Sequence, residues 1–180
     1  SNMLKVFAND LTAKNRDAIL SKLGKEMSKE EKKLASYEKK AAGYQKSLDS
    51  YNKNLDKAQQ KNREATTNIE DTKVKIETSN NLIKEYSASI NPDNSDSAVK
   101  DALKSREKEQ KKLDSYQKSL GGYQKTVESS AKDIEKNMKG KTKAENSLSG
   151  ANKNVEKQRE IVRAKREAYK AVENGECDCA

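Results

Sequence analysis

The sequence contains no histidine and no tryptophan, and it has only one phenylalanine and one proline. Without histidine, the chain lacks the side chain that most often serves as a general acid or base near neutral pH. One proline and seven glycines are too few for a loop-rich or all-β chain. Neither a glycine-rich phosphate loop nor a nucleophile elbow occurs. We therefore expect no enzyme activity and no cofactor.

The only two cysteines, Cys177 and Cys179, lie near the C-terminal end of the sequence. A structural zinc site needs about four ligands, and one chain without histidine does not supply them. Two chains together would offer four thiolates, but in a reducing compartment free thiols are the simpler interpretation. We therefore predict no metal site.

Large apolar residues are also scarce. Hydrophobic residues make up 32% of the chain and charged residues 37%, and the mean hydropathy is −1.19. This balance is typical of disorder or of long helices with a narrow apolar stripe, and it disfavours a compact globule. No stretch approaches the roughly 20 apolar residues of a membrane span. We expect a cytoplasmic protein, and secretion without a cleaved signal peptide stays open. We interpret Ser1 and Asn2, which precede Met3, as a remnant of a cloning tag.

A heptad repeat fills the first half of the chain. Its a positions are Met27, Leu34, Ala41, Leu48, Leu55, Asn62, Ile69, Ile76, Ile83 and Ile90, and its d positions include Tyr37, Tyr44, Tyr51, Ala58, Ala65, Thr72, Ser79 and Tyr86. A period of 3.5 residues keeps one stripe of a helix facing a partner, so the pattern predicts a long coiled-coil helix.

Residues 91–96 interrupt the repeat with a proline among Asn, Asp and Ser, which is turn chemistry. Ser95 or Asp96 can cap a following helix. A second heptad run follows, with a positions every seven residues from Val99 to Tyr169 and d positions every seven from Ala102 to Val172. Asn174 and Gly175 are typical of a helix C-terminus.

Two long helices joined by a short turn run antiparallel. The sequence therefore predicts an all-α fold: a long antiparallel two-helix coiled-coil hairpin with a short N-terminal helix at its base. At 1.5 Å per residue, each arm would be on the order of 120 Å long. The predicted segments are 1–2 (tag remnant), 3–27 (apolar segment and short helix), 28–90 (first long helix), 91–96 (turn), 97–174 (second long helix) and 175–180 (disordered tail). The break near residue 27 rests on Gly24 and on Ser28 with Glu31, which resemble a capping box. A single continuous helix over residues 10–90 is the alternative.

The register of the predicted hairpin has two candidates. In the first, facing residues have numbers that sum to 192, so Asn62 faces Ser130 and Leu113 faces Ser79. Polar residues then meet polar ones and large residues meet small ones. The same register pairs Ile69 with Tyr123. A register one heptad tighter suits the short turn but places Asn62 against Tyr123. We prefer the first.

Large apolar residues outside the simple seam concentrate at the base of the predicted hairpin, where an exposed apolar cluster would mark an interface. We predict a partner or oligomer interface there, formed by Leu4, Val6, Phe7, Ile19, Leu23, Ile161 and Val162. The competing interpretation is that residues 3–23 fold back and complete a small intramolecular core.

The net charge of +9 raises the alternative of nucleic-acid binding. The densest basic cluster, and thus the candidate contact surface, is Lys157, Arg159, Arg163, Lys165, Arg166 and Lys170. Acidic residues are interspersed, so a solvated and salt-bridged surface is the simpler interpretation. All seven tyrosines fall on the seams, which favours packing over base stacking.

An internal repeat is present. Residues 32–37 (KKLASY) recur as residues 111–116 (KKLDSY), and residues 43–46 (GYQK) recur as residues 122–125 at the same offset. The repeat indicates duplication of one helical unit. Either it reflects ancestry alone, which we favour from the sequence, or each copy meets an equivalent surface on a partner.

These patterns favour a non-enzymatic structural or adaptor protein that acts as a spacer or scaffold. We expect a protein partner and self-association into a homo-oligomer, with sequence-nonspecific nucleic-acid binding as the alternative. The outline is similar to that of hairpin stalk proteins of bacterial type III export systems and of phage particles, which implies a role in a secretion or phage-type assembly by analogy of fold alone.

Overall fold

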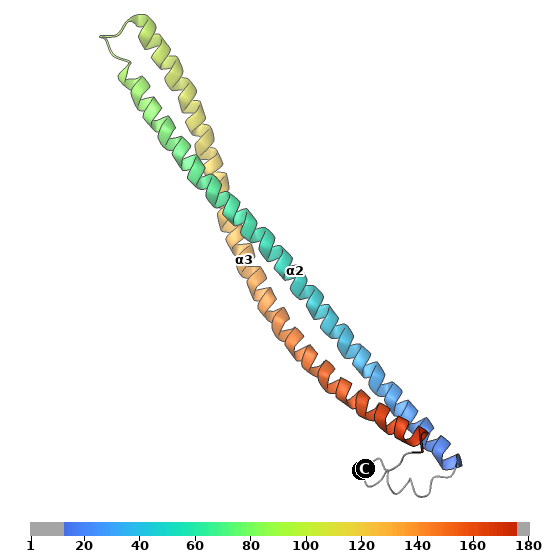
Figure 1. Ribbon diagram of the computed structural model, residues 1–180. Helices are drawn as coiled ribbons and strands as arrows, with labels where there is room; N and C mark the ends of the chain where they lie inside the picture. Colours follow the sequence, from blue (N-terminus) through green and yellow to red (C-terminus); the bar gives the residue numbers. More distant parts are fainter. Residues whose placement is uncertain (1–12, 176–180) are drawn as a thin grey trace. The chain divides into compact units, whose positions relative to one another are not determined.

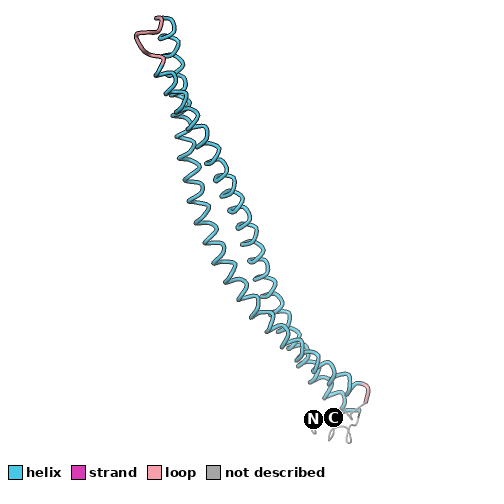
Figure 2. Tube along the Cα trace, turned by 60° about the vertical axis from the view of Figure 1, so that its left-hand side comes forward, coloured by secondary structure: helices cyan, strands magenta, loops and turns pink. Residues whose placement is uncertain are grey.

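The computed structural model describes residues 13–175 of the chain. Within this range the fold is all-helical, with two long helices, α2 (Ala13–Ala88) and α3 (Asp96–Glu173), and no strand. Figure 1 shows both helices, and Figure 2 shows in pink the turn that joins them. The chain divides into two units, which we call the terminal unit (Ser1–Ser50 with Gly140–Ala180) and the turn unit (Tyr51–Lys139).

The start of α2 differs from the sequence-based prediction. Residues 13–27, assigned to a separate short N-terminal helix, are the first turns of α2, and no new helix begins at Ser28. Residues 3–12 of that predicted segment lie outside the described residues. One glycine costs a helix only about 1 kcal/mol relative to alanine, so Gly24 among good helix formers does not end it. Ser28 and Glu31, which have the spacing of a capping box, lie inside the helix and therefore cap no helix end.

The turn confirms the predicted capping chemistry. The Ser95 hydroxyl accepts a hydrogen bond from the Ala98 amide at 3.2 Å and so caps the N-terminus of α3. The Asn91 side chain accepts from the Asp93 amide at 2.9 Å, which forms an Asx turn. The Asn94 side chain donates to the Ser89 carbonyl at 2.6 Å, just beyond the end of α2. Side chains thus satisfy backbone groups at both helix ends.

Burial confirms the predicted heptad phase. Every buried side chain in the described part of the chain lies at an a or d position. These residues are Leu55, Ala58, Ala65, Thr72, Ser79, Ala102, Glu109, Leu113, Ser130, Ala144, Ala151, Val155, Gln158, Val162 and Val172. Because most of them are small or polar, the stripe buries little apolar area, and each residue adds little to the hydrophobic stabilisation.

Within the turn unit, hydrogen bonds between the helices fix an antiparallel register. The Asn62 side chain donates to the Ser130 hydroxyl at 3.0 Å and to the Val127 carbonyl at 3.3 Å. This contact is the one expected for pairs that sum to 192, whereas the tighter register would place Asn62 against Tyr123. Closer to the turn, the buried Ser79 hydroxyl donates to the Glu109 carboxylate at 2.7 Å.

The terminal unit is held by contacts of the same kind. The Gln158 amide donates to the Glu30 carboxylate at 2.6 Å and to the Glu30 carbonyl at 2.9 Å. Lower residue numbers of α2 again meet higher numbers of α3, so the two helix segments run antiparallel in this unit as well. The inter-helix bonds of both units join polar seam residues, which favours one register over slipped ones.

Both ends of the described chain meet in the terminal unit. Gly175 has a positive φ of 68°, and its amide donates to the Val172 carbonyl at 3.1 Å. This left-handed residue ends α3 as the sequence predicted. The Arg16 guanidinium donates to the backbone carbonyl of Glu173, so a cation from α2 meets the negative end of the α3 dipole.

The seam tyrosines are only partly covered. Tyr44 is 39% exposed, and the other six tyrosines are half-buried. The Lys75 ammonium lies over the Tyr116 ring at 5.8 Å from its centroid, which is a cation–π distance. The tyrosines therefore cover the edges of the seam rather than fill it.

Replacing Gly24 by alanine is expected to stabilise the protein. A Cβ at this position would lie 3.5 Å from Cε2 of Tyr169, an ordinary van der Waals distance. The helix preference of alanine adds about 1 kcal/mol, which corresponds to a rise in Tm of about 2–4 °C for a chain of this size. Thermal unfolding followed by circular dichroism measures the change. An unchanged or lower Tm would mean that the Tyr169 ring packs more tightly on Gly24 than the distance indicates.

Candidate functional site

The predicted interface residues differ in accessibility. Leu4, Val6 and Phe7 lie outside the described residues. Ile19 and Leu23 are half-buried on α2. On α3, Ile161 is 43% exposed, whereas its neighbour Val162 is 2% exposed. Val162 therefore packs in the seam between the two helices of the terminal unit, and Ile161 is available to a partner.

Half of the candidate nucleic-acid contacts on α3 are ion-paired. The Lys165 ammonium lies 3.3 Å from the Glu26 carboxylate, and the Arg166 guanidinium lies 3.3 Å from the Glu31 carboxylate. Arg163 pairs with Glu160 on its own helix. Within the described residues, the other members of the cluster, Lys157, Arg159 and Lys170, have no such ion pair. Half of the predicted cluster thus already has carboxylate partners, which weakens it as a phosphate-binding surface.

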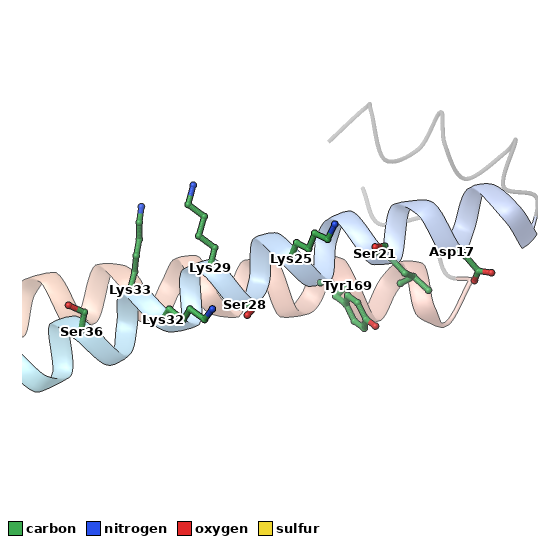
Figure 3. A pocket seen from close by; sticks show the side chains of 11 residues that line it. Asp17, Ser21, Lys25, Ser28, Lys29, Lys32, Lys33, Ser36 and Tyr169 are labelled. Atoms are coloured by element: carbon green, nitrogen blue, oxygen red, sulfur yellow. The ribbon is translucent and has the colours of Figure 1, made fainter.

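A groove follows the first part of α2 in the terminal unit. It has a volume of about 990 Å³ and is lined by Asp17, Leu20, Ser21, Gly24, Lys25, Ser28, Lys29, Lys32, Lys33, Ser36 and Tyr169. In Figure 3, the Tyr169 ring from α3 lies against α2 between Ser21 and Ser28, and Lys29 and Lys33 point to the same side of α2. The ring passes next to Gly24, because a Cβ at that position would lie 3.5 Å from Cε2 of Tyr169.

The groove is strongly basic. Lys25, Lys29, Lys32 and Lys33 are exposed, and none of them has a carboxylate within 4.0 Å among residues 13–175. The one acidic residue in its lining is Asp17. Unpaired ammonium groups beside the apolar edge of Tyr169 and Leu20 suit an anionic ligand with apolar parts.

The sequence interpretation placed the basic surface on α3 and missed this groove on α2. The signal was present, because residues 25–33 carry four lysines on neighbouring turns. The acidic residues Glu26, Glu30 and Glu31 obscured it. In the structure these acids face α3, and all three bind side chains of that helix.

The described residues hold no group of three or more His, Cys, Asp or Glu side chains placed to bind a metal ion. Cys177 and Cys179 lie outside the described residues. Neither α2 nor α3 contains a segment long and apolar enough to cross a membrane.

Comparison with protein-family models gives no match, and neither the curated proteins nor the solved structures include one with significant similarity to this chain.

Proposed function

We propose that this protein is a non-catalytic structural or adaptor element that acts by offering the outer faces of its helices to other proteins. The observation that carries the proposal is the burial pattern. In the described residues only the a and d seam is buried, so the rest of both helices is surface. Binding partners of such elements dock on helix faces rather than in enclosed cavities.

Self-association through the terminal unit is part of this proposal. The seam contains many small or polar residues, such as Ala144, Ala151 and Gln158, so the two helices gain little from each other. A further helical surface would add apolar burial at about 25 cal/mol per Å². Ile161 is an exposed large apolar side chain of this unit, and Ile19 and Leu23 on α2 are half-buried. We propose that a second copy binds at Ile161.

Replacing Ile161 by glutamate is expected to lower the mass of the protein in solution from oligomer to monomer. A charge at the centre of an apolar contact loses its hydration on assembly and disfavours it strongly. Size-exclusion chromatography with light scattering gives the mass. The matched control is Leu103→Glu in the turn unit, because Leu103 and Ile161 are both 43% exposed. The control variant should keep the mass of the unmodified chain.

Two results would contradict this prediction. Equal loss of mass in both variants would locate association elsewhere than at Ile161. An unmodified chain that is monomeric at all concentrations would contradict the self-association part of the proposal.

The surface on α3 that was predicted for sequence-nonspecific nucleic-acid binding gains no specific observation. Its candidate surface on α3 donates to Glu26, Glu31 and Glu160, and competing for those carboxylates reduces any phosphate affinity. We therefore propose the adaptor role alone.

A further inference from the structure

The internal repeat is longer than its two short motifs. Residues 29–50 on α2 align with residues 108–129 on α3 at an offset of 79, and thirteen of these 22 positions are identical. At the same offset, only four of the 38 positions that follow are identical when residues 51–88 are compared with 130–167. Similarity is thus concentrated in one segment of each helix. The first copy lies in the terminal unit and the second in the turn unit.

Inter-helix contacts follow the same repeat. In the terminal unit Glu30 accepts from Gln158, and in the turn unit Glu109 accepts from Ser79. Glu30 corresponds to Glu109 and Ser79 corresponds to Gln158 at the offset of 79. In the terminal unit the first half of α2 packs on the second half of α3, and in the turn unit the second half of α2 packs on the first half of α3. The two units thus share an inter-helix hydrogen bond at corresponding positions of the repeat.

Most of the shared residues do not serve this packing. Four identical pairs lie on the seam, at positions 30, 34, 37 and 44 of the first copy. The other nine pairs are exposed in both copies. They are Lys29 and Lys108, Lys32 and Lys111, Lys33 and Lys112, Ser36 and Ser115, Lys39 and Lys118, Gly43 and Gly122, Gln45 and Gln124, Lys46 and Lys125, and Ser50 and Ser129. Packing between the two helices does not require these nine identities, which favours the interpretation that each copy meets an equivalent surface on a partner.

Lysines repeat every seven residues on the outermost position of both segments. We call these residues the lysine ladders: Lys25, Lys32, Lys39 and Lys46 on α2, and Lys104, Lys111, Lys118 and Lys125 on α3. At 1.5 Å per residue, neighbouring rungs of a ladder are about 10.5 Å apart along the helix. All eight are exposed. In the described part of the chain, none has a carboxylate within 4.0 Å.

A strip of small residues lies beside each ladder. On α2 it is Ser36, Gly43 and Ser50, and on α3 it is Ser115, Gly122 and Ser129, again seven residues apart. Gly43 and Gly122 are within helices, where glycine is less favourable than alanine. A Cβ at either position would meet no atom within 4 Å, so the packing of the described chain does not require glycine at either position. Small side chains on an exposed helix face allow the backbone of another helix to approach closely.

We propose that each ladder with its small-residue strip docks an acidic α-helix of a partner protein, so that one chain binds two such helices. A helix packed lengthwise can repeat a carboxylate every seven residues, which matches the spacing of the ladder along its whole length. Bound phosphates would need the lysines but not the glycine and serines between them. The inference rests on the proposed adaptor role and names its partner. The basic groove beside Lys25 and Lys32 extends the surface in the terminal unit.

A labelled synthetic peptide provides the probe. It is an alanine- and glutamine-based helix with glutamate at every seventh position, and fluorescence anisotropy measures its binding to the full chain. Two peptides should bind per chain. Replacing Lys32, Lys39 and Lys46 by glutamate should reduce the number to one, and the equivalent changes at Lys111, Lys118 and Lys125 should remove the other site. The affinity of the peptide for a ladder that carries these glutamates should fall by at least about tenfold.

Two controls separate spacing and shape from net charge. Lys61, Lys73 and Lys143 are exposed lysines outside the ladders, and their replacement by glutamate makes the same change in net charge but should leave two sites. A peptide of identical composition with glutamates at irregular spacing should bind at least about tenfold more weakly. The variant Gly43→Leu with Gly122→Leu, which favours helix formation, should keep its helicity and lose binding.

Several results would overturn the inference. Equal binding of the two peptides, or unchanged binding by the double leucine variant, would show that charge alone acts. Tighter binding of a short DNA duplex than of the peptide, with no effect of the leucines, would assign the ladders to phosphate instead. Failure of peptide binding in a chain that still self-associates would reject the ladders as docking sites and leave the proposed adaptor role standing.

Discussion

Replacing Val162 by aspartate is expected to lower the free energy of unfolding by about 3 kcal/mol or more. Val162 is 2% exposed and lies in the seam of the terminal unit. A carboxylate there loses its water. The nearby cations of the same helix, Lys165 and Arg166, already pair with Glu26 and Glu31 on α2. Urea unfolding followed by circular dichroism measures the loss.

The adjacent residue supplies the control. Ile161 is 43% exposed, so Ile161→Asp should change the free energy of unfolding of the isolated chain by no more than about 0.5 kcal/mol. The comparison must be made at a protein concentration below that of any self-association, because loss of a bound copy also lowers apparent stability. Similar losses in the two variants would contradict the phase of the α3 seam in the terminal unit.

Replacing Asn62 by leucine is expected to raise the free energy of unfolding by about 1–2 kcal/mol and to loosen the register. Asn62 lies at an a position and donates to Ser130 and to the Val127 carbonyl. Its loss leaves no orphan donor, because the Ser130 hydroxyl also donates to the Val127 carbonyl at 3.1 Å. Leucine therefore adds buried apolar area without leaving a buried polar group without a hydrogen bond. Thermal unfolding gives the sign of the change.

Cysteine crosslinking reports the register in the same variant. In a background with Cys177→Ser and Cys179→Ser, the pair Ile69→Cys and Tyr123→Cys should crosslink in the observed register. The pair Ile69→Cys and Tyr116→Cys should crosslink only after a slip of one heptad. With Asn62 present the first pair should dominate, and with Asn62→Leu the second should become detectable. A lower melting temperature for Asn62→Leu would give Asn62 a role beyond register.

Periodicity and local turn chemistry in the sequence were enough to predict the two helices and their buried faces. Every buried residue of the described chain lies at a predicted a or d position, and the Ser95 cap and the Gly175 end are where the sequence placed them. These features depend on residues a few positions apart, so they can be read without knowing the partner helix. The polar pair Asn62 and Ser130 even indicated the register.

Only the tertiary structure decided which residues on those helices are free to act. The basic cluster on α3 is dense in the sequence, yet Lys165 and Arg166 are paired with acids on α2. The sparser lysines at positions 25, 32, 39 and 46 have no carboxylate within 4.0 Å in the part of the chain that the structure describes. The continuous start of α2 through Gly24 and Ser28 was also settled only there. Ion pairs between two helices depend on the register and rotation of the helices, which a local sequence pattern does not give. A single glycine lowers helix stability only slightly, so the local pattern also does not decide whether the helix continues through it.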